Sequence, residues 1–113
     1  MRNNIAIAQI NPKICDIESN AKKICECIRL SQARDTDLVI FPELALSGYG
    51  ARDMFSCPDF ARKISASIDE IIQFSSKYDT AIIFGTFYYE NNVQGNAVYN
   101  SALFIVKGRL IKY

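Results

Sequence analysis

The sequence predicts an α/β fold in a single domain. Short β-branched runs at residues 4–10, 37–41 and 80–89 alternate with two stretches of helical periodicity, and this alternation is typical of α/β domains. The 113 residues, half of them hydrophobic, hold material for one core. We find no internal repeat, linker or low-complexity segment that would divide the chain.

The first third of the chain predicts a strand, helix, strand unit. Residues 4–10 are apolar on both faces, so we expect a central strand that ends at Asn11 and Pro12. Asp16 is placed to cap a helix. Residues 37–41 predict a buried strand beside the first one, and Pro42 stops it because proline has no N–H to donate. The helix is indicated by apolar residues at helical spacing, namely Ile17, Ala21, Ile24 and Ile28.

A second helix is expected from Pro58 to about Lys77. Proline is tolerated in the first turn of a helix, and the nearby Asp59 suits the positive end of the helix dipole. The predicted inner face consists of Phe60, Ile64, Ile68, Ile71, Ile72 and Ser75.

The remainder of the chain reads as three strands. Residues 80–89 predict a strand, the polar residues 90–96 a turn, and residues 98–106 another strand. Lys107 and Gly108 then form a tight hairpin turn into a last strand at 109–113.

Composition excludes several classes of function. A net charge of +1 with interspersed signs disfavours nucleic acid and anionic membranes as partners. No apolar run reaches about 18 residues, and the start is too short for a signal-peptide core, so we expect a cytoplasmic protein. Without histidine, the usual zinc sites and the Ser-His-Asp and Cys-His arrangements are excluded. The four cysteines show no CxxC spacing and are expected to be reduced, partly buried thiols. No glycine-rich phosphate motif is present.

Glu43 is the leading candidate for a catalytic residue. It follows the apolar strand 37–41, and ligands of open α/β sheets bind at the carboxyl ends of strands. Apolar flanking residues are expected to desolvate the carboxylate and raise its pKa, which suits a general base. The alternative is a solvated surface glutamate.

Four stretches of the chain resemble the carbon-nitrogen hydrolase, or nitrilase, superfamily. They are residues 8–12 followed by Asp16, Ile17 and Asn20; the segment 41–49, FPELALSGY; residues 52–55; and residues 100–102. Within the superfamily, the Asn-Pro opening and the Gly-Tyr extension resemble the glutaminase domains of glutamine-dependent NAD synthetases.

The resemblance implies a fold, a chemistry and partners. Residues 1–113 would form the first half of an α-β-β-α sandwich, part of a glutaminase domain without the synthetase domain. In such enzymes a Cys thiolate attacks the amide, a Glu acts as base and a Lys stabilises the oxyanion. Glu43 matches the base, and Tyr49 would contact substrate or else plug the domain surface. Asn100 is expected to fix a strand end. Glutamine would be the substrate of a homo-oligomeric parent protein, whose synthetase domain would use ATP and Mg²⁺ on deamido-NAD.

The chain also departs from the family pattern. Cys15 and Ser19 replace glycines, and Gly50 and Ala51 stand where two prolines are common. In the family the catalytic Lys lies in a KxxLPNY motif. This Lys and the nucleophilic Cys would fall beyond residue 113, so Lys112 is read as a surface lysine and Cys57 as a structural thiol. We therefore expect the chain alone to be inactive and to expose an apolar sheet face that causes self-association or poor folding.

Three alternatives remain open. The chain could belong to another nitrilase-type amidase or carbamoylase. It could be a non-enzymatic α/β module that binds a nucleotide or a protein, with Glu43 in a structural role. It could also be the product of a degraded gene.

Overall fold

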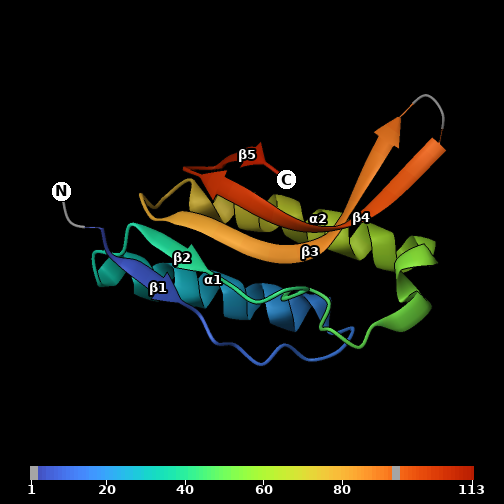
Figure 1. Cartoon of the computed structure of the whole chain (residues 1–113), viewed down its shortest axis with the longest axis horizontal. Helices are drawn as coiled ribbons and strands as arrows, with labels where there is room; N and C mark the ends of the chain where they lie inside the picture. Colours follow the sequence, from blue (N-terminus) through green and yellow to red (C-terminus); the bar gives the residue numbers. More distant parts are fainter. Residues whose placement is uncertain (1–2, 93–94) are drawn as a thin grey trace.

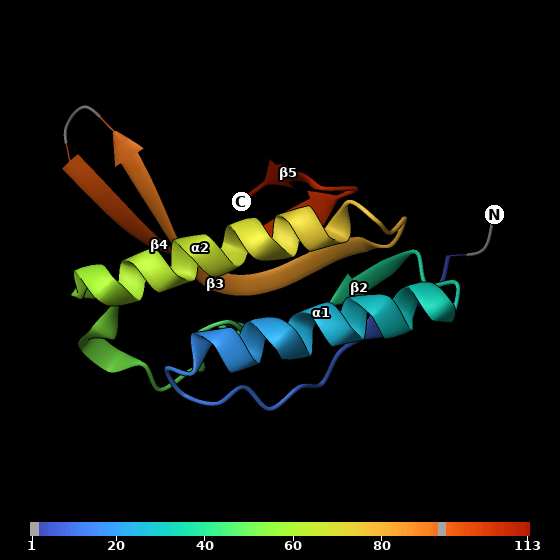
Figure 2. The ribbon, with the colours of Figure 1, turned by 180° about the vertical axis from the view of Figure 1, so that it is seen from behind.

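A computed structural model describes residues 3–92 and 95–113 and shows one mixed sheet with two helices on one face (Figure 1). The five strands lie in chain order, and the view from behind shows the two helices side by side across the sheet (Figure 2). The elements are β1 (Ile5–Ile7), α1 (Ile17–Ala33), β2 (Leu38–Ile40), the 3-10 helix η1 (Arg52–Ser56), α2 (Pro58–Ser75), β3 (Ala81–Asn92), β4 (Gly95–Val106) and β5 (Arg109–Lys112). The predicted α/β class is confirmed.

The first three strands run parallel, and the two helices provide the crossovers between them. β1 pairs with β2 and β2 with β3, so that Ala6, Val39 and Ile82 are in register. The predicted cap of α1 is confirmed because Asp16 accepts a hydrogen bond from the Ser19 N–H at 3.3 Å. Parallel strands need such crossovers, and α1 and α2 both lie on the same side of the sheet.

The hydrophobic core lies between the helices and the sheet. α2 begins at Pro58, as predicted, and ends at Ser75, two residues before the expected end. Its inner face matches the prediction, except that Ser67 is also buried and Ile72 only partly. No helix in the described part of the chain is long and apolar enough to cross a membrane. The largest fully buried apolar side chains are Phe84, Ile24, Ile28, Leu46, Ile64, Ile71, Ile82, Leu103, Ile105 and Val39.

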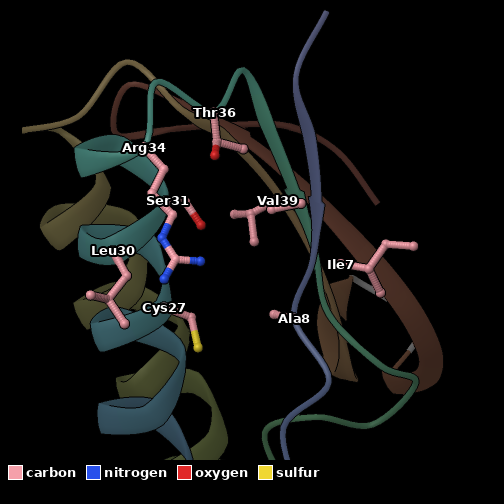
Figure 3. A pocket seen from close by; sticks show the side chains of 9 residues that line it. Ile7, Ala8, Cys27, Leu30, Ser31, Arg34, Thr36 and Val39 are labelled. Carbon is pink, nitrogen blue, oxygen red and sulfur yellow. The ribbon is translucent and has the colours of Figure 1, made fainter.

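The prediction of residues 4–10 as a central strand is wrong. β1 has three residues and lies at the edge of the sheet, with β2 as its partner among the described residues. Ile5 and Ile7 are 60% and 72% exposed. Figure 3 shows Val39 directed toward α1 and Ile7 directed away from it. An apolar run on both faces signals two covered faces, and here only the face toward the helices is covered.

The outer face of the sheet is apolar, as the sandwich expectation requires. Ile7, Ile40 and Ile83 are neighbours in register on three adjacent strands, and Phe104 continues the row on β4. None of these four side chains is buried. The self-association expected from this face stays a prediction.

The polar segment 90–96 is not a turn in the described residues. β3 and β4 continue to pair through it, up to Asn92 opposite Gly95, while residues 93 and 94 lie outside the described part. The hairpin turn between β4 and β5 is confirmed. Lys107 and Gly108 have φ of 47° and 76°, the combination that a tight type I′ turn needs.

Candidate active site

Glu43 lies just after the carboxyl end of β2, where the sequence placed it. The chain leaves the sheet after Phe41, whose N–H still donates to the Ile83 carbonyl at 2.8 Å. It then turns tightly through residues 43–47, and Leu44 takes the left-handed conformation with a φ of 50°. The carboxylate is therefore mounted on a compact turn at the sheet edge where ligands of α/β folds bind.

Gly85 of β3 holds this turn through two backbone hydrogen bonds. Its N–H donates to the Pro42 carbonyl at 3.3 Å, and its carbonyl accepts from the Leu46 N–H at 3.4 Å. The backbone around Glu43 approaches Gly85 too closely for a side chain at that position. A glycine at this point in a strand thus marks a close backbone approach.

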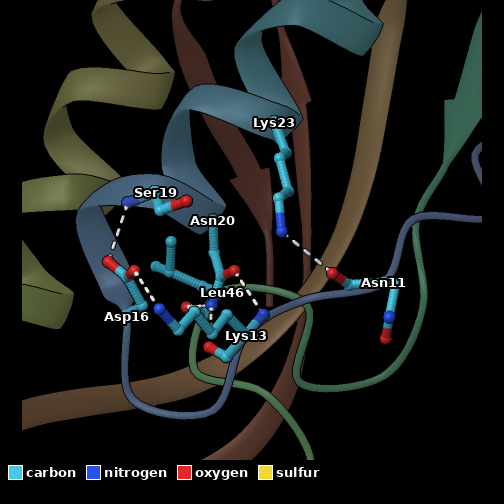
Figure 4. A network of polar contacts seen from close by, with 7 residues as sticks. All are labelled: Asn11, Lys13, Asp16, Ser19, Asn20, Lys23 and Leu46. Carbon is cyan, nitrogen blue, oxygen red and sulfur yellow. Dashed lines mark hydrogen bonds and ion pairs between the residues drawn. The ribbon is translucent and has the colours of Figure 1, made fainter.

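Asn20 joins the Glu43 turn to the loop that follows β1 (Figure 4). Its fully buried amide accepts from the Lys13 N–H at 2.8 Å and donates to the Lys13 carbonyl at 2.7 Å. It also donates to the Leu46 carbonyl at 3.0 Å. A second link is the Cys15 N–H, which donates to the Ser47 carbonyl at 2.8 Å. One side chain on α1 therefore fixes two loops that flank Glu43.

Asn100 contacts Glu43 directly. Its Nδ2 donates to Glu43 Oε1 at 2.7 Å. The expectation that Asn100 fixes a strand end agrees with this contact, because Glu43 lies in the turn that follows β2, although Asn100 itself lies within β4 opposite Phe87. The contact was missed because the two residues are 57 positions apart in sequence. The available signal was an amide side chain inside an otherwise apolar, β-prone run.

Glu43 borders two hollows. The first measures about 460 Å³ and is lined by Asn11, Pro12, Ile14, Pro42, Glu43, Tyr49 and Gly50. The second, about 420 Å³, lies on the outer sheet face and is lined by Ile40, Phe41, Pro42, Glu43, Ile83, Gly85, Asn100, Ser101 and Ala102. Tyr49 is 77% exposed and shares the first hollow with Glu43.

The expected desolvation of Glu43 is not found. Glu43 is exposed in the described structure, although it borders both hollows. Its apolar neighbours Phe41 and Leu44 are each 6% exposed, since they pack into the protein rather than around the carboxylate. A one-dimensional pattern shows which residues flank an acid but not on which side of the backbone they pack.

The other sequence candidates lie away from both hollows. Lys112 is exposed at the end of β5, as predicted for a surface lysine. Cys57 is half-buried at the start of α2 and packs against the core, as predicted for a structural thiol. Burial raises the pKa of Cys25 to about 11 and also raises that of Cys27, so these thiols are poor nucleophiles near neutral pH. No cysteine or lysine lines either hollow. The expectation of partly buried thiols holds for Cys25, Cys27 and Cys57 but is wrong for Cys15, which is exposed.

A separate hollow of about 160 Å³ lies between α1 and the edge strand β1 (Figure 3). Cys27, Ser31 and Arg34 line its helix side. No carboxylate lines it. Among the residues that the structure describes, no group of three or more Cys, Asp or Glu side chains is placed to hold a metal ion.

Comparison with known proteins places these residues in a family. The family model described as carbon-nitrogen hydrolase matches residues 4–112. The glutamine-dependent NAD(+) synthetase of Aquifex aeolicus is 32% identical over 108 residues, which cover 96% of this chain and 18% of that protein. A probable nitrilase of Schizosaccharomyces pombe, C965.09, is 31% identical over 95% of this chain and 40% of its own length.

A solved structure shows the same fold. The glutamine-dependent NAD+ synthetase from Acinetobacter baumannii, in complex with ADP, superposes with a TM-score of 0.77 at 30% identity. The match covers 96% of this chain and 19% of that one. The chain therefore spans about a fifth of the length of the synthetases that it matches.

Proposed function

Because the chain belongs to the carbon-nitrogen hydrolase family, we propose that Glu43 is the general base of a glutamine-hydrolysing site. The observation that carries the proposal is the position of Glu43, at the carboxyl end of β2 and on the border of two hollows. The glutamine-dependent synthetases among its relatives support glutamine as the substrate. Ammonia released from glutamine would then serve the amidation of deamido-NAD.

The proposed chemistry assigns one role to this chain. A thiol gives its proton to Glu43, and the thiolate attacks the carboxamide carbon of glutamine. Glu43 gives this proton to the carboxamide nitrogen, so that ammonia leaves and a thioester forms. The carboxylate then takes a proton from the water that hydrolyses the thioester and returns it to the sulfur. The two hollows contain no cysteine or lysine, so the thiol and the cation that stabilises the oxyanion come from residues beyond these 113. The 113 residues alone are accordingly expected to release no ammonia.

The hollow shared by Glu43 and Tyr49 is the proposed place for the substrate. Its volume of about 460 Å³ is within the range of small-molecule sites. Tyr49 lines this hollow, and since a tyrosine combines an apolar ring with a polar hydroxyl, we assign it to substrate contact.

The remaining properties of the proposed protein lie outside this chain. ATP and Mg²⁺ would act in a synthetase domain, and the intact protein would be a homo-oligomeric ligase. The cysteines Cys15, Cys25, Cys27 and Cys57 are free thiols, which suits the reducing cytoplasm.

A chimaera tests the proposal directly. This chain replaces the matched residues of the Aquifex aeolicus synthetase, and NAD formation is measured with glutamine and, separately, with ammonium salts. Glutamine-driven synthesis should survive the exchange and fall at least about 100-fold in Glu43→Gln, because a general base contributes about 10²- to 10⁴-fold. Ammonia-driven synthesis should not change, which shows that the synthetase domain of the chimaera is intact.

A matched control replaces Glu70, an exposed glutamate on α2, by Gln. This variant should keep glutamine-driven synthesis. If ammonia supports synthesis but glutamine does not, even with Glu43 present, the proposal fails.

A second candidate is a nitrilase-type amidase without a synthetase domain. The likeness to the Schizosaccharomyces pombe nitrilase, of which the chain covers 40%, favours it. The reading frame beyond Tyr113 decides between the two. A Lys followed by LPNY would support the synthetase, and its absence would support the amidase.

A further inference from the structure

The carboxylate of Glu43 is held by one neutral donor. Asn100 Nδ2 lies 2.7 Å from Glu43 Oε1, the distance of a short, charge-assisted hydrogen bond. A carboxylate can only accept hydrogen bonds, so the group that faces it must be the NH₂ end of the amide. Among the described residues, Asn100 is the donor that contacts this carboxylate.

The two residues lie on different kinds of backbone. Glu43 lies in a turn and its side chain is exposed, so several rotamers are open to it. Asn100 lies within β4, paired to β3 from Gly95 to Ile105. The Asn100 side chain is also exposed, so the hydrogen bond restricts both side chains, and the Asn100 backbone anchors the pair to the sheet.

The donor is also suited to a base. An ammonium or guanidinium at the same place would stabilise the carboxylate charge strongly and weaken its ability to take a proton. A neutral amide orients the carboxylate and stabilises its charge less than a cation would. It occupies Oε1 and leaves Oε2 without a hydrogen bond from the described residues.

We propose that Asn100 is a positioning residue that holds Glu43 through Oε1 and leaves Oε2 as the atom that takes the proton. The inference rests on the proposed function. In the step concerned, the S–H bond of the attacking thiol breaks and its proton goes to Oε2. The sulfur electron pair forms the bond to the carboxamide carbon, and the π electrons of the C=O bond move to the oxygen, which becomes the oxyanion.

The test uses the same chimaera with two variants of Asn100. Asn100→Ala removes the donor, and kcat for glutamine should fall about 100-fold while KM changes little, because misplacing a reacting group by about 1 Å costs this much. Asn100→Asp keeps the shape but puts a second carboxylate beside Glu43, so its loss should be at least as large. Val98→Ala, on the same strand at the rim of another hollow, is the matched control and should keep kcat.

Two further measurements separate positioning from folding. Ammonia-driven synthesis should stay constant in all three variants, which shows that the synthetase domain is intact. The urea midpoint of each variant should match that of the unmodified chimaera, because a merely structural role would lower it. If glutamine-driven synthesis depends on Glu43 but not on Asn100, the positioning role is refuted while the proposed function stands. If no glutamine-driven synthesis is seen even with both residues present, both proposals fall. An increase in KM at constant kcat would also refute the positioning role, because it would assign Asn100 to substrate binding.

Discussion

The backbone of Gly85 lies directly against the backbone of Glu43. A Cβ atom on Gly85 would come within 2.7 Å of the Glu43 Cα and within 2.5 Å of the Leu44 backbone nitrogen. Both are backbone atoms of a tight turn, which cannot rotate away as the end of a flexible side chain can. Because Gly85 has no side chain, β3 leaves room here for the turn that carries the proposed base.

We predict that Gly85→Ala lowers the free energy of unfolding by about 1–3 kcal/mol, the usual cost of overpacking. The clash also displaces the Glu43 turn, so glutamine-driven activity of the chimaera should fall more than ammonia-driven activity. Urea unfolding and the two assays check this result.

Gly50→Ala is the matched control for Gly85→Ala. A Cβ on Gly50 would meet the Cδ1 of Ile14 at 2.9 Å, which is the flexible tip of a side chain. This variant should change the free energy of unfolding by less than about 1 kcal/mol. Equal losses in both variants would contradict the role assigned to Gly85.

Asn20→Ala should be among the more damaging substitutions in the chain. It leaves the Lys13 N–H, the Lys13 carbonyl and the Leu46 carbonyl without their partner. Unsatisfied buried groups cost about 1–3 kcal/mol each, and partial access of water to the loops should bring the sum to about 2–4 kcal/mol. Ser31→Ala, at a similarly buried polar position on α1, is the control, and its loss should stay below about 1 kcal/mol. Similar urea midpoints for the two variants would refute the bridging role of Asn20.

Cys15→Gly should stabilise the protein. Cys15 has a φ of 60°, in the left-handed region that costs a side chain about 1–2 kcal/mol. Glycine removes this strain but loses more chain entropy on folding, so the net gain should be about 1 kcal/mol. Cys15→Ala also removes the thiol but keeps the Cβ, and it should give no comparable gain in thermal melting temperature. A gain of the same size in both variants would assign the effect to the thiol instead.

Cys15 also illustrates why the helix boundaries and tight turns could be predicted from the sequence. The resemblance marked Cys15 as a place where relatives carry glycine, and the positive φ supplies the physical reason. Helix boundaries were predictable because their signals are local: Asp16 caps α1 and Pro58 begins α2. The turn at Lys107 and Gly108 is local in the same sense.

Features that depend on distant residues were not predictable. Whether β1 is a central or an edge strand depends on whether a second strand pairs with it. The apolar residues of β1 do not show this. The exposure of Glu43 depends on where Phe41 and Leu44 pack. Its contact with Asn100 requires the register of β4 against β3, which the sequence does not state.

The exposed apolar face of the sheet should make the 113-residue chain self-associate. Ile7 is 72% exposed and adjoins Ile40 on β2, so it is part of a continuous apolar row. Ile7→Lys should raise the monomer fraction in sedimentation velocity runs at several concentrations. Leu30→Lys, at a 42% exposed position on the helix side, should not. A monodisperse monomer with a sharp thermal transition for the unmodified chain would contradict the expectation.

Cys25 should make the stability of the protein depend on alkaline pH. Burial, aided by the negative charge of Glu70, raises the pKa of its thiol from 9.0 to about 11. Between these values the unfolded chain loses the proton and the native protein keeps it, so ionisation favours unfolding. The contribution of the neutral thiol to the free energy of unfolding is complete below pH 9 and is lost as pH rises toward 11.

Cys25→Ala removes the titrating group, and urea midpoints measured from pH 8 to 11 should fall less steeply in this variant. Some decline should remain, because burial also raises the pKa values of Cys27 and Tyr89. An unchanged slope would show that Cys25 titrates alike in the folded and unfolded chain.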